Sequence, residues 1–301
     1  MICPQLIDFE CECLNRALIA YNLPPHKPAL GQAADVISGI AGYLNAGPGS
    51  GLAARYPALA DNERIFEIYP FLGINPAHYS LEALDALLER CFSGHTGRRR
   101  NLREKTGRAR AEGEALGDHT FAGIKLYPPL GFDPWPRESP EDTAALDKVK
   151  LLYRVCEEKR IPMTVHGGSG GYAAFNDKDK LRSITSIEKW SNALSRFPNL
   201  KLNLAHLPLY RKRFFGRVEV RDPRLNETIQ LVKSYGDVYV DVSVRVFEDD
   251  DYRRLAKCIA THPMLAERAM FDSDFPMLLF RMDSYHEYIE AFSRTEEILG
   301  P

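Results

Sequence analysis

Short apolar runs alternate with amphipathic segments along most of this chain, and this alternation restricts its fold more than any other feature. Seven runs have the length and composition of β-strands: residues 2–9, 65–74, 121–127, 161–166, 200–206, 238–244 and 269–274. Helical periodicity appears between them at residues 80–91, 143–159, 187–197, 225–235 and 250–259. Strands that alternate with helices build parallel sheets, because a crossover helix returns the chain to the same end of the sheet. The sequence therefore predicts an α/β fold.

Two α/β architectures accommodate this alternation, a closed barrel and an open doubly wound sheet. An open sheet that binds a dinucleotide needs a Gly-rich turn after its first strand, but Glu-Cys-Glu-Cys-Leu-Asn follows the first run here, at residues 10–15. A barrel needs eight strands, and seven are visible. We predict a TIM-type (β/α)8 barrel whose first strand is missing. No low-complexity or Pro/Gly-rich linker divides the chain, so residues 1–301 are predicted to form a single domain.

The composition argues against several classes of protein. The formal net charge is -2, which gives no overall preference for an acidic or a basic partner. No apolar run reaches the roughly 18 residues that a membrane span needs, and no secretory signal pattern opens the sequence. The six cysteines show no Cys-x-x-Cys spacing and are predicted to be reduced thiols. We expect a cytoplasmic protein that binds neither a membrane nor nucleic acid.

Side chains that can bind metal or carry protons stand at the ends of four predicted strands. In α/β barrels these ends meet at one face, where the chemistry takes place. Two successive apolar strands end in His166 and His206, although only eight of the 301 residues are histidine. Either histidine alone is better explained as a hydrogen-bonded core residue, but the whole set predicts an active site. The other side chains at these ends are Lys125, Tyr127, Asp272 and Asp274.

The strand-end motifs resemble those of one family. GIKLYPPLGFDP (123–134), IPMTVHGGSGG (161–171), LKLNLAHL (200–207) and RAMFDSDFP (268–276) are similar, in this order, to motifs of the amidohydrolase-related (amidohydrolase 2) family of the amidohydrolase superfamily, with coverage of residues 2–292. The resemblance implies that His166 binds a metal ion, that His206 is the electrophile or proton donor beside the substrate, and that Asp274 is both metal ligand and base. It implies a metal-dependent hydrolase of amide, ester or lactone carbonyls, with non-oxidative decarboxylation at the same site as the alternative.

The residue types agree with this chemistry. We predict one divalent metal ion, Zn²⁺. Such an ion lowers the pKa of bound water to about 7, and in a catalytic site it needs about three protein ligands. His166 offers a nitrogen ligand and Asp274 offers a carboxylate. The carboxylate can also accept a proton from the attacking water and return it to the leaving group, while His206 polarises the carbonyl.

The His-x-His pair that ends the first strand of this family is absent, because none of the eight histidines forms such a pair. In one placement, residues 6–12 are strand one, and Glu10 and Glu12 complete an oxygen-rich site. In the placement that we favour, residues 2–10 are strand two and strand one lies upstream of Met1, since residues 13–64 contain no convincing strand. The chain would then be an N-terminally truncated barrel, for which a fragment without catalytic activity is the alternative function. Two open sheet edges would also favour a homo-oligomer.

Three further side chains are candidates for binding a small, anionic substrate. Lys125, Tyr127 and Arg211 are predicted to lie at or beyond strand ends on the active-site face, where cations attract anions. A carbamylated Lys125 that bridges two metals is the less favoured alternative. Asp272 is predicted either to add negative charge beside Asp274 or to be a hydrogen-bonded turn residue. The basic run at residues 98–110 is predicted to be a solvated insertion, because no aromatic residues are interleaved for stacking on bases.

Overall fold

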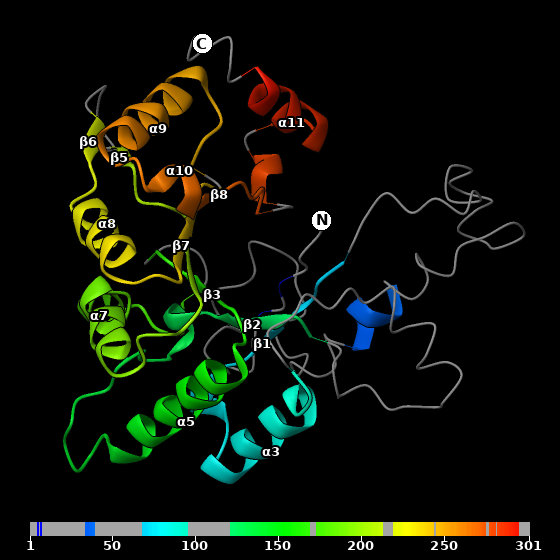
Figure 1. The fold of residues 1–301 in the computed structure, drawn as a ribbon, viewed down its shortest axis with the longest axis vertical. Helices are drawn as coiled ribbons and strands as arrows, with labels where there is room; N and C mark the ends of the chain where they lie inside the picture. The colour runs from blue at the N-terminus through cyan, green and yellow to red at the C-terminus, as the bar shows by residue number, and fades with distance from the viewer. Residues whose placement is uncertain are drawn as a thin grey trace, which may run out of the picture.

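A parallel sheet is the centre of the fold. The computed structural model describes residues 5, 7, 34–39, 68–95, 121–168, 173–212, 219–243, 245–274, 277–280 and 282–294. Within them, six strands form one sheet in the order β1-β2-β3-β4-β7-β8, with every neighbouring pair parallel (Figure 1). These strands are β1 (Phe71–Gly73), β2 (Gly123–Leu126), β3 (Met163–His166), β4 (Leu202–Ala205), β7 (Val238–Asp241) and β8 (Ala269–Met270).

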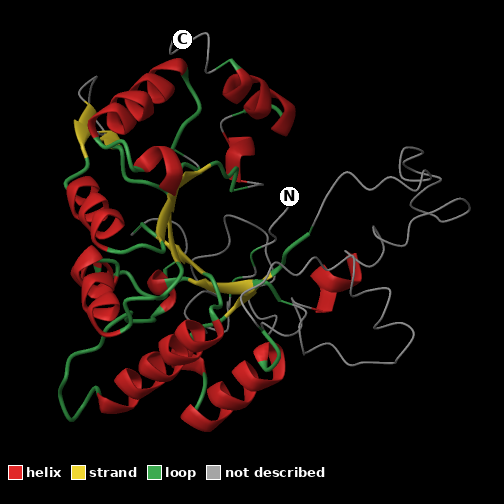
Figure 2. Ribbon diagram, viewed as in Figure 1, coloured by secondary structure: helices red, strands yellow, loops and turns green. Residues whose placement is uncertain are grey.

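The sheet follows an arc and does not close in the described part of the chain, which is consistent with a partial barrel. Figure 2 shows the strands as a curved row with helices on its outer side. Every residue of β2 and β4 is buried, as expected for a parallel sheet covered on both faces. The α/β prediction is confirmed, and six of the seven predicted strands are present.

The helices lie where the periodicity predicts them. Helix α5 (Thr143–Lys159) has the predicted bounds, and α3 (Leu81–Phe92) begins after Ser80, whose side chain accepts a hydrogen bond from the Ala83 N–H at 3.1 Å. Helix α5 packs against α3, and α7 packs against α8. The remaining elements are α6 (Lys178–Ile184), α7 (Ile187–Arg196), α8 (Arg224–Ser234), α9 (Asp249–Thr261), α10 (Leu265–Arg268), α11 (Tyr285–Ser293) and the short 3-10 helices η4 (Pro76–His78), η5 (Pro128–Leu130) and η6 (Met277–Phe280).

The strand predicted at residues 269–274 is too long, because β8 ends at Met270. Beyond it, a side-chain oxygen of Asp272 accepts hydrogen bonds from the backbone N–H groups of Ser273 (2.7 Å) and Asp274 (3.4 Å). Such a local bond offers the backbone an alternative to a strand ladder. The backbone at Asp274 is left-handed, with φ 50, so the chain turns away from the strand direction there.

An antiparallel hairpin that the sequence analysis missed follows β4. It consists of β5 (Tyr210–Lys212) and β6 (Glu219–Arg221), with Arg211 opposite Val220. The basic residues of this segment indicated a charged patch and concealed its strand character. The predicted substrate-binding residue Arg211 therefore lies in a strand and not in a loop.

The segment predicted as the first visible strand lies almost wholly outside the described residues. One contact of it is described, a parallel bridge between Gln5 and Phe71 of β1. This bridge agrees with the placement of residues 2–10 as strand two, next to the strand predicted at residues 65–74. Glu10, Glu12 and the basic run at residues 98–110 lie outside the described residues.

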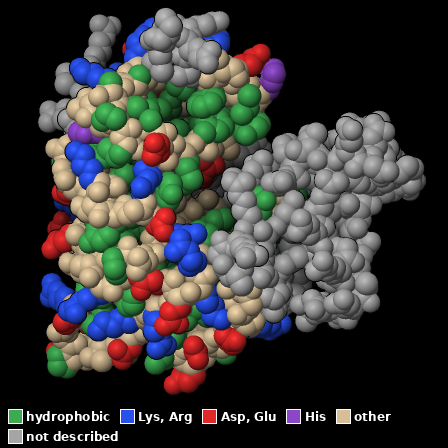
Figure 3. Space-filling view, viewed as in Figure 1, with side chains coloured by type: hydrophobic (Ala, Val, Ile, Leu, Met, Phe, Trp, Pro, Cys, Tyr) green, Lys and Arg blue, Asp and Glu red, His purple; other side chains and the backbone are tan. Residues whose placement is uncertain are grey.

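The described surface is mixed in character. Figure 3 shows Lys and Arg interspersed with Asp and Glu over the visible face, as the small net charge predicts. Within the described part of the chain, none of the helices combines the length and the apolar character that crossing a membrane requires.

Candidate functional site

The carboxyl ends of β3 and β4 bring the two predicted histidines together. His166 is the last residue of β3 and pairs in register with Ala205, the residue before His206. The Nε2 atom of His206 lies 3.1 Å from the Nδ1 atom of His166, and the rings meet edge to face with their centroids 4.8 Å apart. The sequence predicted that both side chains reach one mouth, and in the structure they are in direct contact.

The backbone at His206 has left the strand. Its φ is 66, which is a left-handed conformation that a residue with a side chain seldom adopts. Its N–H donates to the Oδ1 atom of Asp241 at 2.9 Å, and the next N–H, of Leu207, donates to the backbone oxygen of Asp241 at 2.7 Å. A strained conformation of this kind costs on the order of 1–3 kcal/mol and persists only where its surroundings impose it. Asp241 is the residue that imposes it.

Asp241, at the end of β7, is a site residue that the sequence analysis missed. Its side chain is fully buried and accepts from the His206 N–H, from Nδ2 of Asn203 (2.8 Å), and from both the N–H (3.2 Å) and the hydroxyl of Ser243. A buried carboxylate requires such donors, because desolvation without them is costly. The signal in the sequence was the lone charge in the apolar run VYVDVSV at residues 238–244.

Lys125 lies in β2 and is only 6% exposed. Burial lowers the pKa of its ammonium group, against the opposing effect of Asp241, Asp274 and Asp272. Among the described residues, no hydrogen bond or ion pair engages its side chain. A buried ammonium group without a fixed partner suits an anionic ligand better than a structural ion pair.

The two aspartates after β8 differ in environment. Burial, and then the charge of Asp241, raise the pKa of Asp272 to about 6, while the hydrogen bonds from Ser273 and Asp274 act in the opposite direction. Asp272 thus has the turn role that was one of its predicted alternatives, and its charge also lies close to the site. Asp274 lies near enough to His206 and Lys125 for its charge to act on the pKa of both.

Burial also lowers the pKa of His206, although Asp241 and Asp274 oppose this effect. An imidazole whose pKa lies below its ordinary value of about 6.5 is neutral at pH 7. Its Nδ1 atom lies 2.8 Å from the Ser243 hydroxyl oxygen and 3.2 Å from the Ser243 backbone oxygen. The ring of His206 is therefore held at both nitrogens.

Two features fix the segment that carries His166. The ring of Tyr127 stacks on the ring of His166, with the centroids 4.2 Å apart and the planes 15° from parallel. Tyr127, which the sequence predicted as a substrate contact, thus also contacts a residue of the site. After β3, the backbone oxygen of Gly167 accepts from Arg224 at 3.1 Å, and Arg224 is itself paired with Asp222, which is 2% exposed. This pair, of which Asp222 is buried and Arg224 is partly exposed, ties the start of α8 to the end of the strand that carries His166.

The described residues do not complete a metal site. No group of three or more His, Cys, Asp or Glu side chains in the described ranges is arranged to hold a metal ion. His166 has the right donor chemistry, but its Nδ1 atom is engaged by His206. About three protein ligands are needed, so the number of described donors falls short of what the prediction requires.

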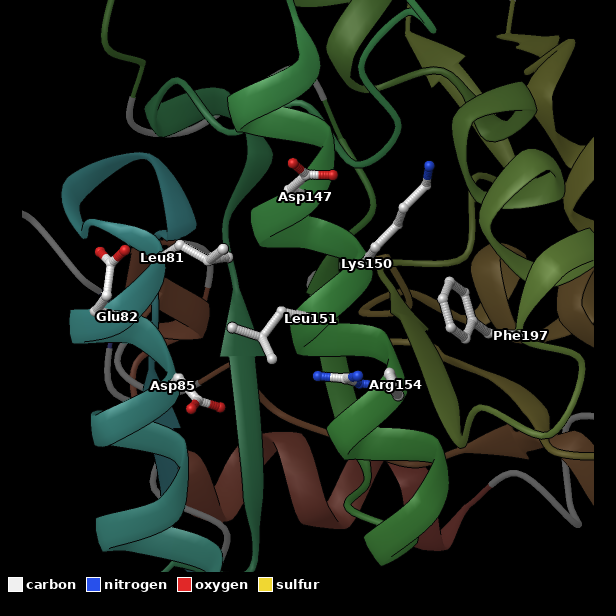
Figure 4. A pocket seen from close by; sticks show the side chains of 8 residues that line it. All are labelled: Leu81, Glu82, Asp85, Asp147, Lys150, Leu151, Arg154 and Phe197. Atoms are coloured by element: carbon white, nitrogen blue, oxygen red, sulfur yellow. The ribbon is translucent and has the colours of Figure 1, made fainter.

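A separate hollow of about 450 Å³ lies on the outer side of the helices and contains none of the predicted site residues. It lies beside α3 and α5, and Figure 4 shows Leu81, Leu151 and Phe197 among the side chains that line it. Charged side chains complete its lining: Glu82, Asp85, Asp147, Lys150 and Arg154.

Comparison with known proteins gives a family match over most of the chain. The sequence model of one family, described as Amidohydrolase, matches residues 83–298. A search of curated proteins found no match.

Solved structures with low similarity were also found. A dihydroorotase from Campylobacter jejuni is 17% identical, with 82% of this chain and 69% of that chain covered and a TM-score of 0.36. An amidohydrolase from Burkholderia multivorans with bound HEPES is 14% identical, with 81% of this chain and 71% of that chain covered and a TM-score of 0.41. A 5-carboxyvanillate decarboxylase from Novosphingobium aromaticivorans, complexed with manganese and 4-hydroxy-3-methoxy-5-nitrobenzoic acid, is 13% identical. The match covers 87% of this chain and 68% of that chain, with a TM-score of 0.37. At these identities and scores, none of the three bears on the chemistry of this chain.

Proposed function

The chain belongs to the amidohydrolase family, and we propose that it hydrolyses an amide, ester or lactone bond at the ends of β3, β4 and β7 and in the segment after β8. The observation that carries this proposal is the direct contact of His206 with His166 at 3.1 Å, within the electrostatic reach of Asp274. A buried, neutral imidazole beside a carboxylate is suited to moving protons at pH 7.

Each side chain has a proposed part in this reaction. Asp274 takes a proton from the attacking water and returns it to the leaving group. His206 is proposed to lie beside the substrate and to exchange a proton through its Nε2 atom, which in the resting structure contacts Nδ1 of His166. Lys125 binds an anionic group of the substrate, because its buried ammonium has no partner among the described residues. Tyr127 and Arg211 are proposed as further substrate contacts, and the substrate is proposed to be a small anionic molecule.

Metal dependence remains part of the proposal. Members of the superfamily use divalent metal ions, and we propose Zn²⁺ with His166 and Asp274 as ligands. Since the described donors are too few, further ligands would have to come from elsewhere in the chain, with Glu10 and Glu12 as candidates. The proton transfers proposed above take place at Nε2 of His206 and at the carboxylate of Asp274.

A substrate panel tests the function. Purified protein is incubated with anionic lactones, esters and amides and with aromatic and enoic carboxylic acids, and both acid release and CO₂ release are measured. We expect hydrolysis of at least one class, and a fall of about 100-fold or more in His206→Asn, as for the loss of a general acid or base. The control is His286→Asn, since the His286 side chain is 80% exposed on α11 and should leave the rate unchanged.

The alternatives give different results in the same assay. CO₂ release without hydrolysis would identify the decarboxylase. No turnover of any compound would favour the non-catalytic fragment. A cytoplasmic location and a homo-oligomeric state are proposed from the sequence alone.

A further inference from the structure

The geometry points to Asp241 and Ser243 as positioning residues that hold His206 in the tautomer with its proton on Nδ1. The Nε2 atom of the neutral ring then carries the lone pair and faces His166. The importance of this arrangement for catalysis rests on the proposed function, but the tautomer itself does not. A histidine tautomer is set by the partner of the other ring nitrogen.

The first evidence is an acceptor that cannot donate. The Nδ1 atom of His206 lies 3.2 Å from the backbone oxygen of Ser243. A carbonyl oxygen carries no hydrogen, so the hydrogen of this contact must belong to Nδ1. This contact alone disfavours the other neutral tautomer, in which two lone pairs would face each other.

The second evidence is that the Ser243 hydroxyl has its own proton committed. It donates that proton to the Oδ1 atom of Asp241, a carboxylate that can only accept. The Ser243 oxygen, 2.8 Å from Nδ1, is therefore left to accept from His206. Asp241 is fully buried and held by Asn203 and by the His206 N–H, so this end of the chain of hydrogen bonds is rigid.

The direction of donation then continues to His166. Because Nε2 of neutral His206 has no hydrogen, the 3.1 Å contact requires His166 to donate from Nδ1. Three groups thus donate in one direction: His166 donates to His206, His206 donates to Ser243, and Ser243 donates to Asp241. In this state His206 accepts a proton through Nε2, and it becomes a proton donor only after it has been protonated. This differs from the resting proton donor that the sequence resemblance implied.

The tautomer can be measured without a substrate. Protein labelled with ¹⁵N-histidine is studied by long-range ¹H–¹⁵N correlation at about pH 8.5, well above the ordinary histidine pKa, and His206→Asn assigns the signals of His206. We expect a protonated Nδ1 and an unprotonated Nε2 in the wild type. A wild-type His206 with its proton on Nε2 would overturn the proposal, whether or not hydrolysis is ever found.

Two variants test the positioning residues. In Ser243→Ala only the backbone oxygen remains as acceptor, so the Nε2–H population should rise about fivefold, the equivalent of one typical hydrogen bond. In Asp241→Asn the Ser243 hydroxyl is held less strongly, and we expect a shift in the same direction. Asp241→Asn should fold, because Oδ1 of Asn203 has no partner among the described residues and can accept from the new amide after a flip.

The control is Ser195→Ala, whose hydroxyl donates to the Asn192 backbone oxygen on the exposed side of α7 and should leave the His206 spectrum unchanged. If both variants fold and both keep the wild-type tautomer ratio, Asp241 and Ser243 do not position the ring. If Ser243→Ala does not fold, Ser243→Thr replaces it as the test. Ser243→Thr keeps the hydroxyl and should retain the wild-type tautomer of His206, and loss of that tautomer in Ser243→Thr would count against the proposal.

Discussion

Replacing Gly167 with alanine should force β3 and β4 apart at the end of the sheet where the candidate site lies. A Cβ atom on Gly167 would lie 2.1 Å from the backbone oxygen of Ala205, whereas ordinary contact begins at 3.4 Å. The obstacle is the backbone of β4, which cannot turn aside as a flexible side chain can. The two backbones would have to separate by about 1 Å, which also lengthens the 3.1 Å contact between His166 and His206.

The expected size of the effect follows from this clash. Forcing extra volume into a packed region costs about 1–3 kcal/mol, and a chain of this size loses about 2 °C of melting temperature per kcal/mol. Circular dichroism melting should therefore show a fall of about 2–6 °C for Gly167→Ala. Gly236→Ala is the matched control, because nothing lies within 4 Å of its added Cβ, and its melting temperature should stay the same or rise slightly. Equal melting temperatures for the two variants would refute this reasoning.

Tyr252→Phe should keep or increase the stability, because the buried Tyr252 hydroxyl has no hydrogen-bond partner among the described residues. Tyr153→Phe should cost about 1 kcal/mol, since the Tyr153 hydroxyl donates to the Pro134 backbone oxygen at 2.8 Å. Urea unfolding of the two variants compares these effects. Burial raises the pKa of Tyr252 to about 12, so the stability of the wild type should fall relative to Tyr252→Phe as the pH rises above about 10, where only the unfolded tyrosine ionises. Elemental analysis should find less than one zinc per chain, because the described residues offer too few donors to hold the ion tightly; one tightly bound zinc would show that further ligands, with Glu10 and Glu12 as candidates, complete the site. Arg211→Gln should raise KM for an anionic substrate, and an unchanged KM would exclude Arg211 as a contact.

The sequence predicted those parts of the fold that depend on local periodicity. Helix α5 has its predicted bounds because its apolar positions recur with the helical period. The six strands β1, β2, β3, β4, β7 and β8 were predicted because strands of a buried parallel sheet have continuous apolar sequences. His166 and His206 were predicted for the same reason, since each directly follows such a run.

The parts that were missed depend on contacts between strands. Asp241 and Ser243 lie in a run that reads as an ordinary strand, and their role appears only when β7 is placed beside β4 and His206 turns left-handed. The early end of β8 depends on which backbone groups the Asp272 side chain bonds. Donor and acceptor pairings across a sheet are set by register, which a single run of residues does not encode.

Turnover by Asp274→Asn tests most directly whether the strand-end site is catalytic. Asparagine tolerates the left-handed backbone at this position as aspartate does, so the variant removes the charge and leaves the fold intact. Asp237→Asn is the control, because Asp237 pairs with the exposed Arg160 at 3.3 Å and precedes β7, whereas the site residue Asp241 lies at the other end of that strand. On the substrate class that the wild type hydrolyses, kcat of Asp274→Asn should fall by about 100-fold or more while the control stays unchanged. A kcat for Asp274→Asn equal to that of the wild type would contradict the proposed site.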